Sequence, residues 1–171
     1  YQFGIRNGMI LLLNVVTALV IGLLTEQLAV VAVFTLSFMV LRSYTGGYHS
    51  DSRIFCYLGS NLVLLVPVYT QAVFYKTSLA WLLAVLLVSA GIIFLLSPMH
   101  SKNRKLDKEE QKHFGRKARL IAALELAVLG ILWHAGQIPY AYAVYTGICI
   151  TALFMLIGKA QLWIQSHTEN G

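Results

Sequence analysis

The residues best suited to chemistry are a histidine and a cysteine, His49 and Cys56, in a polar stretch that begins at Arg42. A cysteine attacks a carbonyl carbon as its thiolate, and a nearby imidazole can accept the proton of the thiol. On one continuous helix the two residues would lie about 10 Å apart along the axis, too far for the sulfur to contact the ring. We therefore expect the helix to break between them.

The residues around this pair are suited to such a break. Gly46 and Gly47 permit backbone conformations that other residues resist, and the segment Ser50–Ser52 offers good N-caps for a helix that begins just before Arg53. With a cap at this place, Cys56 lies about one turn into the helix. There the N-terminal end of the helix dipole and the arginine both favour the thiolate, and the histidine would fold back toward the cysteine.

The spacing alone also allows a purely structural interpretation. Cysteine is a common small apolar residue in buried helices, and a loop histidine near a membrane interface often only forms hydrogen bonds. A metal site is not expected, because zinc needs three or four ligands and the sequence has no second close pair of histidine and cysteine. Cys149 is expected to pack within an apolar helix, and we predict no cofactor.

The composition excludes an ordinary soluble domain and predicts an all-α, polytopic membrane protein. Of the 171 residues, 58% are apolar and 12% are charged, against about 45–50% and about 25% in soluble domains. A spanning helix needs about 20 mostly apolar residues. Six transmembrane helices are predicted, at Asn7–Thr25, Gln27–Leu41, Ile54–Tyr75, Thr77–Met99, Leu120–Ala135 and Ile138–Gly158. The second of these is short unless it extends to Tyr44.

The positions of lysine and arginine predict the orientation, because basic residues in short loops face the cytoplasm. With a cytoplasmic N-terminus, Lys76 is the one basic residue left outside. The C-terminus, the loop with His49 and the hydrophilic segment Pro98–Arg119 are then cytoplasmic as well. We treat residues 1–171 as a single domain and expect a further N-terminal segment ahead of Tyr1.

The hydrophilic segment Ser97–Arg119 carries most of the net charge of +6. Its eight basic residues against Asp107, Glu109 and Glu110 give a formal charge of +5. Two interpretations remain open: contact with anionic lipid headgroups, or a docking surface for an acidic peptide. Nucleic acid is not an expected partner, because Phe114 is the one aromatic residue of the segment.

Glu125 is a carboxylate within a predicted span, where charge is costly and usually paired. It lies only about 9 Å along the helix from Arg119. We therefore expect it to pair with Arg119, Arg116 or Arg42.

The run from Arg42 to Cys56, with Gly-Gly-Tyr-His followed by cysteine seven residues after the histidine, resembles the signature of the AgrB family of membrane endopeptidases. Pro98 and the basic run Asn103–Leu106 resemble the second cytoplasmic loop of that family, and the six-span layout agrees. The resemblance implies that Cys56 is the nucleophile and His49 its general base. It also implies supporting roles for Arg42, for the loop or the substrate, and for Gly47, for the tight backbone path.

The resemblance further implies the substrate, an AgrD-like precursor of an autoinducing peptide in Gram-positive quorum sensing. Cleavage through a thioester on Cys56 would release the acidic C-terminal tail, and acyl transfer within the substrate would close a thiolactone or lactone. Arg104 and Lys105 would recognise the tail, and the enzyme would be a homodimer in the cell membrane with its active site on the cytoplasmic side. The alternative from the residues alone is a non-catalytic membrane carrier or scaffold for a peptide.

Overall fold

The computed structural model describes residues 2–45, 53–99 and 108–168, with side chains described for 12–45, 59, 61–99, 109 and 111–164. Every regular element in these ranges is an α-helix, which confirms the all-α class. The helices are α1 (Gln2–Leu24), α2 (Leu28–Thr45), α3 (Arg53–Lys76), α4 (Leu79–Leu96), α5 (Lys108–His134) and α6 (Ile138–Thr168).

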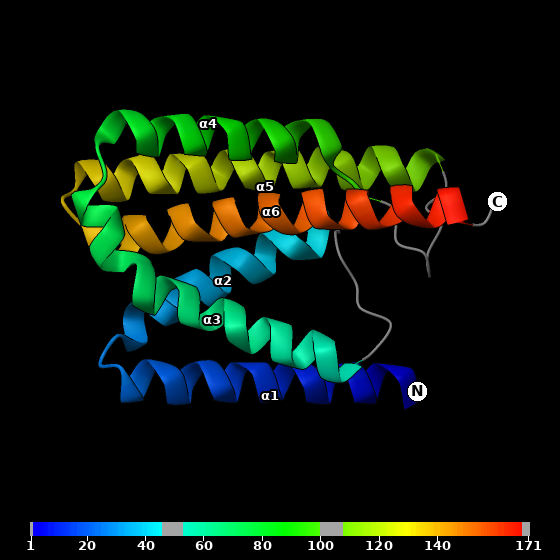
Figure 1. Ribbon diagram of the computed structural model, residues 1–171, viewed down its shortest axis with the longest axis horizontal. Helices are drawn as coiled ribbons and strands as arrows, with labels where there is room; N and C mark the ends of the chain where they lie inside the picture. Colours follow the sequence, from blue (N-terminus) through cyan, green and yellow to red (C-terminus); the bar gives the residue numbers. More distant parts are fainter. Residues whose placement is uncertain (1, 46–52, 100–107, 169–171) are drawn as a thin grey trace.

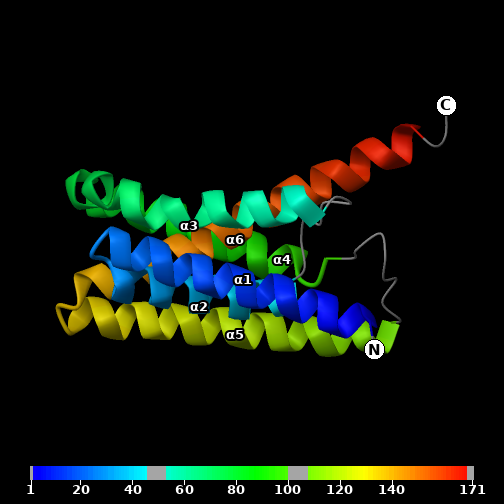
Figure 2. The same cartoon turned by 90° about the horizontal axis from the view of Figure 1, so that it is seen from below.

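The helices run back and forth along one long axis (Figures 1 and 2). The start of α1, the end of α2, the start of α3, the end of α4, the start of α5 and the end of α6 all lie at the same end of the bundle, on the right in Figure 1. We call this the loop end. Helix α6 contacts α2, α3, α4 and α5, and helix α2 contacts α1, α3, α5 and α6, so these two helices form the centre of the bundle.

Within the described residues, three helical segments are long and apolar enough to cross a membrane: Leu28–Thr45, Leu79–Leu96 and Ile138–Ile164. The shortest of them has 18 residues, which corresponds to about 27 Å, close to the thickness of the hydrocarbon core. A shorter apolar segment of α1, Leu12–Leu24, is also present in the part of the chain with described side chains. The number of six transmembrane helices stays a prediction.

The observed helix ends agree with four of the six predicted spans to within a few residues, and α2 does extend beyond Leu41. The prediction that Pro98–Arg119 is a loop is wrong in its second half, because α5 already begins at Lys108. The reason is a stripe of small residues at helical spacing, Gly115, Ala118 and Ala122, which is buried against the bundle. Helix α6 similarly continues past the predicted end of its span to Thr168.

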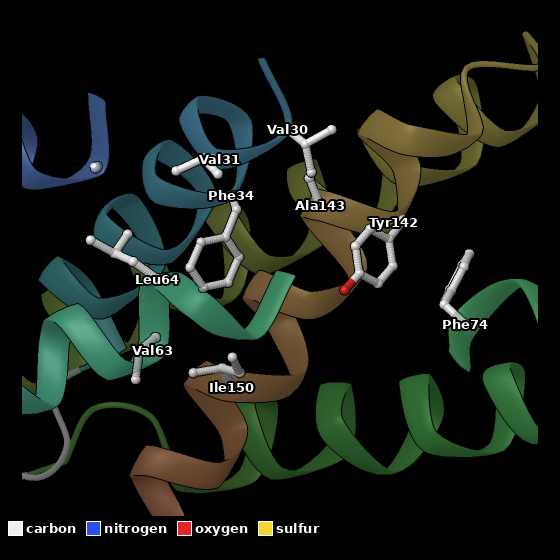
Figure 3. Packing of buried hydrophobic residues seen from close by; sticks show 10 residues of the cluster. Val30, Val31, Phe34, Val63, Leu64, Phe74, Tyr142, Ala143 and Ile150 are labelled. Atoms are coloured by element: carbon white, nitrogen blue, oxygen red, sulfur yellow. The ribbon is translucent and has the colours of Figure 1, made fainter. Parts of the chain in front are cut away.

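The core consists of two clusters that meet at α6. One joins α1, α2, α3 and α6 around Phe34, which is fully buried (Figure 3). In the same cluster Tyr142 of α6 packs on Phe74 of α3, with ring centroids 4.8 Å apart. The hydroxyl of Tyr142 donates a hydrogen bond to the carbonyl of Pro67 at 2.9 Å. This hydrogen bond fixes the middle of α3 to α6.

Helices α2 and α6 approach each other closely at Ser37, which is also the residue that binds Glu125. A Cβ atom built at Gly147 of α6 would lie 2.5 Å from Oγ of Ser37 on α2, so a larger residue there would force the serine to shift. The same hydroxyl donates a hydrogen bond to Oε2 of Glu125 on α5 at 2.6 Å. The expectation that Glu125 pairs with an arginine is therefore wrong, since its partner among the described side chains is the neutral hydroxyl of Ser37 on α2.

Candidate functional site

Cys56 lies in the first turn of α3, as the fourth residue of a helix that begins at Arg53. This confirms the predicted start of the helix and the predicted depth of the cysteine within it. The backbone N–H groups of a first helical turn have no partner within the helix, and the positive end of the helix dipole lies there. The position therefore favours negative charge, on a thiolate or on an oxygen bound beside it. The side chain of Cys56 and the predicted caps Ser50–Ser52 lie outside the described parts of the structure.

His49 and Gly47 also lie outside the described residues. The structure does describe the helices on either side of this segment. A contact between His49 and Cys56 requires that the two residues do not lie on one continuous helix. Helix α2 runs toward the loop end and stops at Thr45, whereas α3 begins at Arg53 and runs away from it (Figure 1). Arg42 and Cys56 therefore lie on two separate helices that run in opposite directions.

Arg42 lies in the last turn of α2 and is held between two aromatic rings. Its guanidinium carbon lies 4.8 Å from the ring centroid of Phe154 on α6 and 5.7 Å from that of Phe38 on its own helix. A guanidinium over aromatic faces is attracted electrostatically and fixed in orientation. The structure thus places a fixed positive charge at the loop end, one turn before α2 stops.

The connection after α4 packs directly against the end of α2. The backbone N–H of Met99 donates a hydrogen bond to the carbonyl of Thr45 at 2.9 Å, and Thr45 is fully buried. A Cβ atom at Gly115 of α5 would lie 3.0 Å from Cδ of Pro98, so α5 packs closely against the same connection. Thr45 and Met99, the last described residues before the two hydrophilic loops, therefore lie side by side. Arg104 and Lys105 lie between Met99 and the start of α5, outside the described residues.

The first turns of α5 present an exposed basic surface at this end. Lys112, His113 and Arg116 line a shallow hollow of about 560 Å³ together with Glu109 and Phe114. The opposite face of the same turns is the buried stripe of small residues described above. The helical part of the basic segment is therefore anchored on one side and open to a ligand on the other.

Comparisons with known proteins identify the family. The family described as Accessory gene regulator B matches residues 1–157. The chain belongs to the AgrB family. It is 26% identical over 156 residues to the Accessory gene regulator protein B of Staphylococcus intermedius, an alignment that covers 89% of this chain and 80% of that protein. No solved structure gives a significant match.

An AgrB-family chain with three helices able to cross a membrane is a membrane protein. For the sites predicted from sequence, the structure places Arg42 at the loop end and Cys56 in the first turn of a helix that begins there. It adds contacts that sequence reasoning missed, namely the bond from Met99 to Thr45 and the packing of Gly115 on Pro98. Gly115 in the buried stripe of α5 is the sequence signal that could have indicated the packing on Pro98.

Proposed function

We propose that this AgrB-family protein is a membrane cysteine endopeptidase, a thiol protease of the hydrolase class. It would remove the C-terminal tail of an AgrD-like precursor and promote closure of a (thio)lactone autoinducing peptide for quorum sensing. The observation that carries the proposal is the family match over residues 1–157 combined with the place of Cys56 in the first turn of α3.

In the proposed reaction His49 accepts the proton of the Cys56 thiol, and the thiolate attacks the carbonyl carbon at the junction between peptide and tail. The backbone N–H groups of the first turn of α3 would stabilise the negative charge on the carbonyl oxygen. The C–N bond breaks, the tail takes the proton from the histidine and leaves, and a thioester remains on the cysteine. A thiol of the substrate then attacks the thioester and closes a thiolactone, or a hydroxyl closes a lactone.

Arg42 and Gly47 would support this chemistry by position. The two aromatic rings restrict the arginine, so its charge stays at the loop end beside the entrance of the segment that carries His49. This supports a role in orienting the loop or the substrate. Gly47 would allow the tight backbone path of the same segment.

The proposed partner is the acidic tail of the precursor, bound by the basic surface at the loop end, where α3 also begins. Arg104 and Lys105 remain the proposed contacts, and the exposed turns of α5 extend the surface with Lys112 and Arg116. The twelve residues from Lys108 to Arg119 correspond to about 18 Å of helix, so part of this charge projects away from the apolar bundle. Binding of an acidic peptide here would hold the precursor at the end of the bundle at which α3 begins.

We further propose six transmembrane helices in the cell membrane of a Gram-positive bacterium, with both termini and the site in the cytoplasm. Six helix ends flank the termini and the two hydrophilic loops, and all six lie at one end of the bundle. This arrangement supports the proposed topology. Lipids would cover the apolar faces, and a homodimer is the proposed assembly.

The proposal is tested by reconstituting the protein in liposomes with its cognate precursor and measuring the released tail by mass spectrometry. Cys56→Ala and Cys56→Ser should abolish release, because a serine hydroxyl is far less ionised at neutral pH than a thiol. His49→Ala should reduce it strongly. Cys149→Ala is the matched control and should cleave normally, because this cysteine lies in the middle of α6.

A carrier or scaffold would behave differently in the same experiment. It would leave the precursor intact, and the Cys56→Ala variant would bind and retain the precursor as the wild type does. Intact precursor with folded wild-type protein would therefore refute the peptidase assignment.

A further inference from the structure

Two adjoining apolar hollows lie at the end of the bundle opposite the loop end. One is a lateral groove of about 410 Å³ between α3 and α4, with α6 as its third wall. The other has about 260 Å³ and lies among α4, α5 and α6. Phe74, Leu82 and Tyr145 line both, so these three side chains form a common wall between the groove and the second hollow. Helices α3 and α4 diverge from their short connection (Figure 1).

Three hydroxyl groups in the walls, those of Thr70, Tyr142 and Thr146, already have partners within the protein. The hydroxyl of Tyr142 donates to Pro67 and lies 2.6 Å from the hydroxyl of Thr70. The hydroxyls of Thr70 and Thr146 donate to backbone carbonyls one turn earlier in their own helices. The walls therefore offer a ligand apolar surface, and a polar ligand group would lose its hydrogen bonds with water on entering.

The alkyl chains of the bilayer are the apolar partner that reaches this groove. Its rim residues Trp81 and Val73 are 70% and 63% exposed, and α4 is one of the three helices able to cross a membrane. An apolar cavity of about 150 Å³ is large enough to bind benzene, and the inner hollow is larger. We propose that one alkyl chain of a membrane lipid enters between α3 and α4 and ends in the hollow behind Leu82. This site is separate from Cys56 and does not depend on the proposed peptidase activity.

A lipid that carries a photoactivatable diazirine at the end of one palmitoyl chain tests the proposal in vesicles that contain the full chain. After illumination, peptide mapping by mass spectrometry measures the label on each residue. A chain seated in the inner hollow should label Leu129 and Trp133 more strongly than Leu24 of α1, although Leu24 is 80% exposed. Labelling by surrounding lipid alone would instead follow exposure.

Gly130→Leu provides the blocking variant, because Gly130 lines the inner hollow and a Cβ atom there has no heavy atom within 4 Å. The matched control is Gly91→Leu on α4, which is equally free of contacts and lines neither hollow. We expect the blocking variant to lose the enhanced label on Leu129 and the control to keep it, with unchanged helical circular dichroism in both. Two results would overturn the proposal: label that follows exposure in all variants, or a hollow that stays unlabelled because a second copy of the chain fills it.

Discussion

Replacing Gly147 by alanine should destabilise the bundle, because the new methyl group would lie 2.5 Å from Oγ and 3.1 Å from Cβ of Ser37. Extra atoms in a packed core cost about 1–3 kcal/mol. The Ser37 hydroxyl cannot rotate away from the new methyl group without cost, since it is bonded to Glu125 on a third helix. We expect a loss of unfolding free energy within that range for Gly147→Ala.

A double-mutant cycle separates this clash from a general effect on the helix. Ser37→Ala alone removes a hydrogen bond and should cost about 1 kcal/mol. It also removes the atom that clashes most closely with the new methyl group, so the cost of the double variant should fall about 1 kcal/mol or more below the sum of the two single costs. Unfolding by SDS in mixed micelles, followed by circular dichroism, measures all four proteins.

The control for this cycle is Gly91→Ala, where a Cβ atom meets nothing within 4 Å. That variant should be neutral or stabilised by about 0.5–1 kcal/mol, because alanine is the better helix former. The reasoning is refuted if Gly147→Ala is as stable as this control, or if the effects in the cycle are additive.

Two further predictions concern the bundle and the basic surface. Tyr142→Phe removes the bond to the carbonyl in the middle of α3 and should lower the unfolding free energy by about 1 kcal/mol, whereas Tyr69→Phe, at a side chain that is 74% exposed, should change nothing in the same SDS titration. Lys112→Glu at the loop end should weaken binding of the acidic precursor in a salt-dependent manner, while Lys76→Glu at the opposite end should not. Equal effects of the two charge reversals in a vesicle binding assay would contradict docking on α5.

Much of the fold was predictable from sequence because apolar length and charge spacing determine where helices cross a membrane. The start of α3 at Arg53 followed from the cap residues ahead of it, and the extension of α2 followed from the length that a span requires. The first turns of α5 were missed because a run of charge resembles a loop. The buried stripe around Ala118 that makes those turns helical is short and consists of small residues.

The contacts that organise the loop end were beyond sequence reasoning for a different reason. The bond between Met99 and Thr45 joins backbone atoms, which any residue types would supply. The partner of Glu125 was predicted as an arginine on grounds of charge. The partner in the structure is Ser37 of α2, which lies 88 residues earlier in the chain. Such pairings depend on how the helices pack, and a single sequence does not specify that.

The most direct test of the central claim is the intact mass of the protein after brief incubation with its cognate precursor. The account predicts an added mass equal to the precursor without its tail, carried by the peptide that contains Cys56 and released by hydroxylamine, as expected for a thioester. The adduct should be absent in Cys56→Ala and present in Cys149→Ala. Released tail without any adduct in the wild type, or an adduct that persists in Cys56→Ala, would contradict the assignment of Cys56 as the nucleophile.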